Sequence, residues 1–170
     1  MRLPRLRFLI PFAAAIFLSL GANSYVATQY SDDQRIAKIT WKAACRISNY
    51  EVCPKKGPAV RRSPILGEMA SARGAYWLGS SVIWLDKPLS GTQVWLTVFH
   101  EQIHYLQTVN GVTMEGYDQT LRCLVEREAL ELTNAYVDEL GAPRSYKRTV
   151  EVWCKLYGCT PNSGKQIMGH

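Results

Sequence analysis

The sequence predicts a single α+β domain, mainly helical, in which a short β-hairpin precedes a long helix. The chain has 170 residues, the usual size of one domain with one core. Apolar residues recur at helical spacing in several long segments, and two short apolar runs flank a Gly-Ser-Ser turn. The composition, 47% hydrophobic and 20% charged, is that of a globular protein and argues against disorder.

Residues 1–27 are expected to form a signal peptide or a membrane anchor, and residues 28–170 the folded domain. Residues 1–7 are basic, and residues 8–21 form an uncharged apolar run that small residues follow. Because this run is shorter than the roughly 20 residues that a spanning helix needs, a cleaved signal is favoured over a retained anchor. The domain is therefore expected to be exported, either periplasmic or secreted, or to be held at the inner membrane by its N-terminal segment.

The net charge of +6 does not indicate a nucleic-acid partner. Arg2, Arg5 and Arg7 contribute three of these charges, and 6 − 3 leaves only +3 for the rest of the chain. That excess is too small for a nucleic-acid-binding surface. Contact with a membrane is expected only through the N-terminal segment, if that segment is not cleaved.

Five cysteines suit an exported protein, because an oxidising compartment permits disulfides. Cys45 and Cys53 flank a short polar loop and are the first candidate pair. Cys154 and Cys159 are a second local pair, which leaves Cys123 over. Alternatively, Cys123 pairs with one of the C-terminal cysteines, or the cysteines are free buried thiols.

The first helix of the domain is expected to begin at residues 31–34, whose sequence Ser-Asp-Asp-Gln has the pattern of a capping box. Residues 54–64 are rich in Pro, Lys and Arg and are expected to be a loop. The apolar residues of the helix at helical spacing are expected to face the core: Ile36, Ile39, Ala43 and Ile47.

The hairpin is expected from the runs 75–78 and 82–85. A helix follows over 92–109 and ends at Asn110-Gly111. Two further helices complete the expected fold, over residues 120–140, ended by Gly141 and Pro143, and over residues 145–156, before a loose tail.

The sequence His100-Glu101-Gln102-Ile103-His104 lies within the helix 92–109 and indicates a metal site. Residues four apart share one face of a helix, so the two imidazoles point to one place, as a tetrahedral zinc ion requires. Glu101 is offset by one residue. That offset suits a general base acting on a water at the metal better than it suits a ligand.

The motif and its flanks resemble the zincin metallopeptidases, since Thr97, Val98 and Leu106 match the extended consensus around HExxH. The metzincin subfamily needs a histidine six residues after the motif, where this chain has Asn110. The resemblance is therefore to the glutamate-type zincins (gluzincins) of the small bacterial or phage kind. Their third zinc ligand is a glutamate three residues before a helical alanine, which implies Glu126 ahead of Ala129.

The hydrophobic pattern of the helix 120–140 leaves a second possibility for the third ligand. Glu128 lies in the middle of the expected apolar face and Glu126 at its edge. A glutamate on an apolar face needs a partner, and a metal ion would be one. Glu131 and Glu115 are next in line. The expected apolar residues of this helix are Leu121, Leu124, Val125, Leu132 and Ala135.

The resemblance also implies that an edge strand ahead of the active helix binds an extended peptide. Tyr76, Trp77 and Trp84 line such a cleft or else belong to the core. An oxyanion-stabilising residue would be a Tyr or Arg, because no histidine remains for that role. Tyr117, Tyr136 and Arg127 are the candidates, and each suits a structural role as well.

The expected function is that of a zinc-dependent metallopeptidase acting on a peptide or protein substrate. His100, His104 and Glu126 hold Zn²⁺, and Glu101 is the general base for a zinc-activated water. One alternative is a catalytically inactive zincin-fold module for binding or assembly. Another is a disulfide-stapled exported structural protein without a metal.

Overall fold

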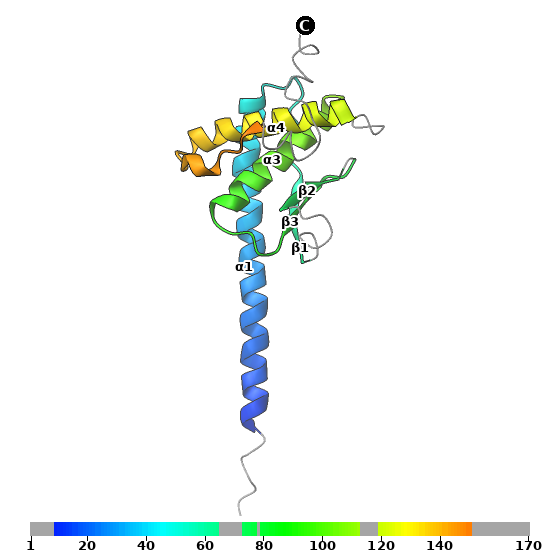
Figure 1. Ribbon diagram of the computed structural model, residues 1–170. Coiled ribbons are helices and arrows are strands. Elements are labelled where there is room, and N and C mark those ends of the chain that lie inside the picture. The colour runs from blue at the N-terminus through cyan, green and yellow to red at the C-terminus, as the bar shows by residue number, and fades with distance from the viewer. Residues whose placement is uncertain (1–8, 65–72, 78, 113–118, 151–170) are drawn as a thin grey trace, which may run out of the picture.

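The computed structural model describes residues 9–64, 73–77, 79–112 and 119–150, of which residues 9–27, 119 and 120 are described by their backbone alone. These residues form an α+β fold in which a small sheet packs against long helices (Figure 1), as the sequence predicts. The elements are α1 (Leu9–Ser48), β1 (Ala59–Ser63), β2 (Gly74–Tyr76), β3 (Val82–Asp86), α3 (Thr92–Val109), α4 (Gln119–Glu139) and the short 3₁₀ helix η2 (Arg144–Tyr146).

The sheet has the strand order β1-β3-β2 and is mixed. β2 and β3 pair antiparallel, so the predicted hairpin is confirmed. β1 pairs parallel to β3, so the expectation of a loop over residues 54–64 was wrong for residues 59–63, whereas residues 54–58 form no helix or strand, as expected. Val60, Ile83 and Leu85 are fully buried while their neighbours are more exposed, which is the alternation of a strand with one face on the core. The alternation is not recognisable in the sequence, because Pro, Lys and Arg residues surround Val60.

Helix α1 runs without a break through the residues expected to start it. The Ser31 Oγ hydroxyl donates to Thr28 O at 2.9 Å, a contact within the helix rather than an N-terminal cap. The buried face is centred on Ala37, Thr40 and Ala44. Ile39, two residues after Ala37, lies about 200° round the helix and is 44% exposed, contrary to the expected core position. In the described part of the chain, no helix combines the length and apolar character needed to cross a membrane.

The expected Cys45–Cys53 disulfide is present, with a Cα–Cα distance of 5.8 Å. Cys123 is also disulfide-bonded. The expectations that Cys123 is left over, or that these cysteines are free thiols, were therefore wrong. Cys154 and Cys159 themselves lie outside the described residues.

Helix α3 matches its expected bounds and α4 begins one residue earlier and ends one residue earlier than expected. The helix expected from residue 145 does not begin there. The Asn134 amide donates to Arg148 O at 2.9 Å and accepts from Arg148 N at 3.0 Å. Residues 147–149 belong to no helix or strand, and Lys147 has an extended backbone. The rest of that expected helix and the tail lie outside the described residues.

Helix α3 lies at the centre of the fold, between α1, α4 and the sheet (Figure 1). Phe99 and Ile103 are fully buried, and the Phe99 ring stacks on Tyr136 of α4 with ring centroids 4.3 Å apart. Val98, also fully buried, packs instead with the sheet and α1. The face of α3 that carries the two histidines is consequently the one presented to α4.

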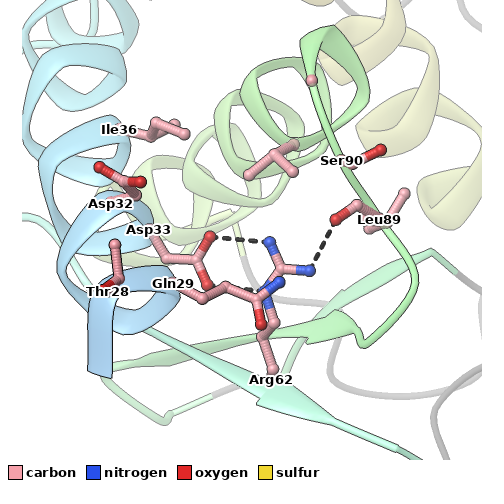
Figure 2. A pocket seen from close by; sticks show the side chains of 10 residues that line it. Thr28, Gln29, Asp32, Asp33, Ile36, Arg62, Leu89 and Ser90 are labelled. Atoms are coloured by element: carbon pink, nitrogen blue, oxygen red, sulfur yellow. Dashed lines mark hydrogen bonds and ion pairs between the residues drawn. The ribbon is translucent and has the colours of Figure 1, made fainter. Parts of the chain in front are cut away.

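A buried ion pair joins α1 to the sheet. Arg62 of β1 binds Asp33 through two parallel hydrogen bonds, from Nε at 2.7 Å and from Nη2 at 2.8 Å. The same guanidinium donates to the backbone carbonyl oxygens of Lys87 and Leu89, so β1 is also tied to the chain after β3. Figure 2 shows the contacts of Arg62 with Asp33 and Leu89 beside a pocket of about 250 Å³.

Replacing Asp33 with alanine is expected to lower the free energy of unfolding by about 3 kcal/mol, because the buried guanidinium of Arg62 loses its counter-charge. The matched control is Asp32→Ala, whose ion pair with Arg35 is more than half exposed and should contribute under about 1 kcal/mol. Denaturant unfolding of the disulfide-bonded protein measures both. Equal losses in the two variants would contradict the role of the ion pair.

Candidate metal centre

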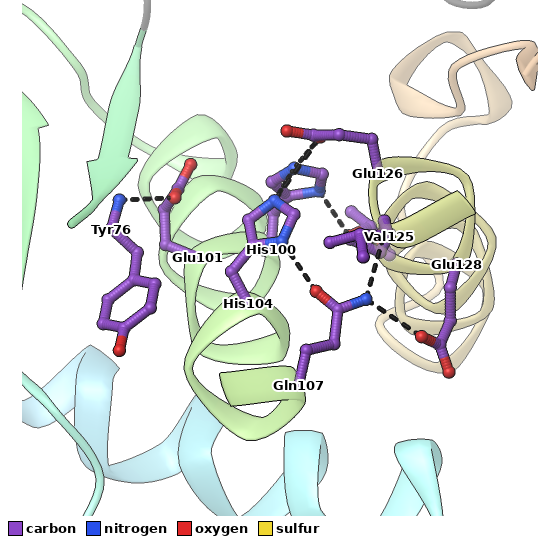
Figure 3. A network of polar contacts seen from close by, with 10 residues as sticks. Tyr76, His100, Glu101, His104, Gln107, Val125, Glu126 and Glu128 are labelled. Atoms are coloured by element: carbon purple, nitrogen blue, oxygen red, sulfur yellow. Dashed lines mark hydrogen bonds and ion pairs between the residues drawn. The ribbon is translucent and has the colours of Figure 1, made fainter. Parts of the chain in front are cut away.

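The two histidines of the motif and Glu126 of α4 converge on one point (Figure 3). The Nε2 atoms of His100 and His104 are 3.1 Å apart. An Oε2 atom of Glu126 is 3.4 Å from each of them. The three side chains are 18%, 8% and 20% exposed, respectively, so the group is largely shielded from solvent.

The spacing of these three atoms fits a tetrahedral zinc ion. Zinc ligand atoms lie about 2.0–2.2 Å from the ion, which places them about 3.3–3.6 Å from one another. Contacts of 3.1–3.4 Å approach that spacing closely. Two imidazoles and one carboxylate are also a ligand set that catalytic zinc sites use, with the fourth position left for water or substrate.

The outer nitrogen of the His100 ring contacts Thr133 of α4, which sets the tautomer. His100 Nδ1 lies 3.3 Å from Thr133 Oγ1. The hydroxyl has one proton and donates it to Ala129 O at 2.7 Å, so it can only accept from the ring. Neutral His100 therefore carries its proton on Nδ1 and turns the lone pair of Nε2 toward Glu126.

The His104 ring is held in the same tautomer by Gln107. Both protons of the Gln107 amide are used, one on Val125 O at 2.8 Å and one on Glu128 Oε2 at 2.9 Å. The amide oxygen therefore accepts from His104 Nδ1, at 2.8 Å. The Nε2 lone pair of His104 therefore points to the same place as the Nε2 lone pair of His100.

Three acceptors this close together favour a positive charge between them. Burial alone lowers the pKa of His104, but the hydrogen bond and charge of Glu126, with a contribution from Glu101, raise it by more, to about 9. Burial raises the pKa of Glu126, but hydrogen bonds from the two histidines lower it by more and hold it well below its usual range. A proton thus occupies the group in the metal-free protein, and a metal ion would replace it.

The two glutamates of α4 lie on opposite sides of a buried ridge. Val125 and Ala129 form the ridge, with exposures of 3% and 0%. Glu126 leans toward the histidines, whereas Glu128 accepts from Gln107 and from the Tyr50 hydroxyl, the latter at 2.7 Å. The expectation that Glu128 lies in the middle of the apolar face was wrong. The expected apolar residue Ala135 is exposed, and the buried residues of α4 are Cys123, Val125, Ala129, Leu130, Tyr136 and Val137.

Glu101 lies beside the group of three and not within it. Its side chain is turned toward the sheet, where Oε2 accepts from the backbone N–H of Tyr76 at 2.8 Å (Figure 3). Gly74 allows this close approach, because a Cβ there would clash with Thr97 and touch the Glu101 side chain. The Glu101 carboxylate is thereby held against strand β2.

The other expected site residues are dispersed. Trp77 is 61% exposed, whereas Tyr76 and Trp84 are partly buried. Tyr136 is buried in the core, where burial and the charge of Glu139 raise its pKa to about 12. Arg127 pairs with Glu131 on the surface. Tyr117 and Glu115 lie outside the described residues.

Three residues of the site were not among those expected: Tyr50, Gln107 and Thr133. Gln107 is three residues after His104, and residues at that spacing contact each other on a helix, so the sequence carried a signal for it. Tyr50 and Thr133 come from other segments, and only the packing of α1 and α4 brings them near.

No protein-family model, curated protein or solved structure matches this chain. The resemblance to zincins therefore depends on the chain itself, in the motif from His100 to His104 and in Glu126. The geometry of those residues is the evidence on which a function is proposed below.

The purified protein is expected to hold about one equivalent of zinc, by metal analysis, and to lose it on His100→Ala or His104→Ala. Glu126→Ala is expected to release zinc at chelator concentrations that leave Glu128→Ala loaded, because only Glu126 faces the two rings. The reverse order would transfer the third ligand to Glu128. A wild-type protein that takes up no zinc would contradict the site altogether.

Proposed function

We propose that this protein is a zinc-dependent metallopeptidase of the glutamate-type zincin kind. The proposal is carried by one observation: the lone pairs of His100 Nε2, His104 Nε2 and a Glu126 oxygen converge while both Nδ1 atoms are engaged elsewhere. Neighbouring protein groups orient each ring in this way at many catalytic metal sites.

A zinc ion held by these residues would polarise a substrate carbonyl and make water a better nucleophile near neutral pH. Glu101 takes the proton of the attacking water and passes it to the leaving amine nitrogen. The Tyr76 N–H holds Oε2 of this carboxylate, so Oε1 is the oxygen that remains to accept the proton. Burial of Glu101 at 8% exposure limits its contact with bulk solvent.

The substrate class is inferred from the outer edge of β2, which pairs with no second strand among the described residues. In the antiparallel pair, Ala75 lies opposite Trp84 and Asp86 N donates to Arg73 O, so alternate residues of β2 bond to β3. The backbone groups of Gly74 and Tyr76 point to the other side, where Glu101 already binds the Tyr76 N–H, so a peptide would pair with the Tyr76 carbonyl oxygen and with the backbone of Gly74. An extended peptide can pair with such an edge, which favours a peptide or protein substrate.

The proposed function includes export of the protein from the cytoplasm. The Cys45–Cys53 disulfide and the bonded Cys123 suit an oxidising compartment, either the periplasm or the extracellular space. The basic and apolar N-terminal residues supply the targeting signal or an inner-membrane anchor.

Glu101→Gln is expected to keep zinc and the fold but to lower peptide hydrolysis by about 10²–10⁴-fold, because the amide cannot take up the proton. The assay is cleavage of a peptide library by zinc-loaded protein, read by mass spectrometry, with Glu131→Gln as the surface control. Undiminished hydrolysis by Glu101→Gln would place the base elsewhere. A zinc-loaded wild type that cleaves no peptide would favour a binding or assembly module.

A further inference from the structure

A continuous chain of hydrogen bonds leads from His104 to the disulfide-closed segment after α1. The His104 ring donates to Gln107, whose amide donates to Glu128 and to Val125 O (Figure 3). Glu128 Oε2 also accepts from the Tyr50 hydroxyl at 2.7 Å. Burial and Glu128 raise the pKa of Tyr50 well above its usual range, so the hydroxyl remains a donor at neutral pH. In each of these hydrogen bonds, donor and acceptor can be assigned in one way only.

The direction of these hydrogen bonds indicates that Glu128 fixes the orientation of the Gln107 amide. A side-chain amide can rotate and exchange its oxygen and nitrogen, which would turn an N–H of Gln107 toward His104. Glu128 and Val125 O prevent this because both accept protons from the Gln107 nitrogen. Tyr50 in turn fixes the Glu128 carboxylate. Rotation of the amide would favour the wrong tautomer of the ring and weaken its Nε2 as a ligand.

The segment that carries Tyr50 is held at several points. The Cys45–Cys53 disulfide closes it across eight residues of sequence separation. Val52 N donates to the Asn110 side-chain oxygen at 2.9 Å, and the Asn110 amide donates back to Val52 O at 2.8 Å. Asn110 is the residue that ends α3, so the segment is fastened to the helix that carries both histidines.

We infer that Tyr50 and Glu128 are positioning residues of the metal centre, which hold the Gln107 amide against the ring and so set the affinity of the site for zinc. The Cys45–Cys53 disulfide contributes to the same property, because it holds Tyr50 in place. This inference rests on the proposed zinc site and is independent of the substrate and of catalysis by Glu101.

The test is the dissociation constant for Zn²⁺ of the full, oxidised chain, measured by competition with a chelator. Glu128→Ala is expected to weaken binding by about 10–100-fold, as loss of a group that orients a ligand typically does. Tyr50→Phe should weaken it less, by about 3–10-fold, because one further hydrogen bond is lost at a distance. Glu128→Gln keeps an acceptor oxygen for both donors and should bind zinc nearly as tightly as the wild type.

Glu131→Ala is the matched carboxylate control on the same helix and should bind zinc as the wild type does, since its partner is Arg127. Thermal unfolding of each metal-free variant accompanies the measurement. A purely structural role for Glu128 would lower the melting temperature and leave the zinc affinity of the folded protein unchanged. That result, or an equal loss in Glu128→Gln and Glu128→Ala, would overturn the inference.

The disulfide is tested by a double-mutant cycle. Replacing Cys45 and Cys53 with serine should weaken zinc binding, and adding Tyr50→Phe should then cost less than it does alone, because both changes act through one contact. Fully additive losses would exclude the disulfide from the network. If the serine variant does not fold, Tyr50→Phe with the disulfide intact still decides the role of the tyrosine. A wild type that binds zinc tightly but cleaves no peptide would refute the peptidase and leave this inference standing.

Discussion

Three acceptor atoms brought together in a shielded place are the constraint around which the rest of this structure is arranged. Nitrogens and a carboxylate oxygen at 3.1–3.4 Å repel one another unless a positive charge lies between them. The packing of α3 against α4, with the stacked rings of Phe99 and Tyr136 nearby, provides the free energy that holds them there. The outer nitrogens of both rings are fastened as well, so the inner ones have little freedom to turn away.

The sheet packs against the other side of α3, where it contacts Glu101. Gly74 lets β2 approach α3 closely enough for a backbone N–H to reach Glu101. Arg62 and Asp33 hold β1 on α1, and β1 supports β3, which in turn carries β2. The edge strand is short, and its position depends on this succession of contacts more than on its own pairing.

Local patterns in the sequence predicted the parts of the site that lie on a single helix. The spacing of His100 and His104 placed both rings on one face, and the bounds of α3 were correct to the residue. The choice between Glu126 and Glu128 was harder, because the two lie about 200° apart on α4 and only the rotation of that helix decides which one faces α3. The pattern predicted an apolar face centred on Glu128, whereas the packed face is centred on Val125 and Ala129.

The three candidate ligands are divided between two helices, two on α3 and one on α4. A metal ion bound there would therefore act as a cross-link between these helices, and its binding free energy would be counted as folding free energy. Because only the folded state presents all three atoms, stability would rise with the logarithm of the free zinc concentration once that concentration exceeds the dissociation constant. The fraction of molecules in which α4 is packed on α3 would then depend on the free zinc concentration around the protein.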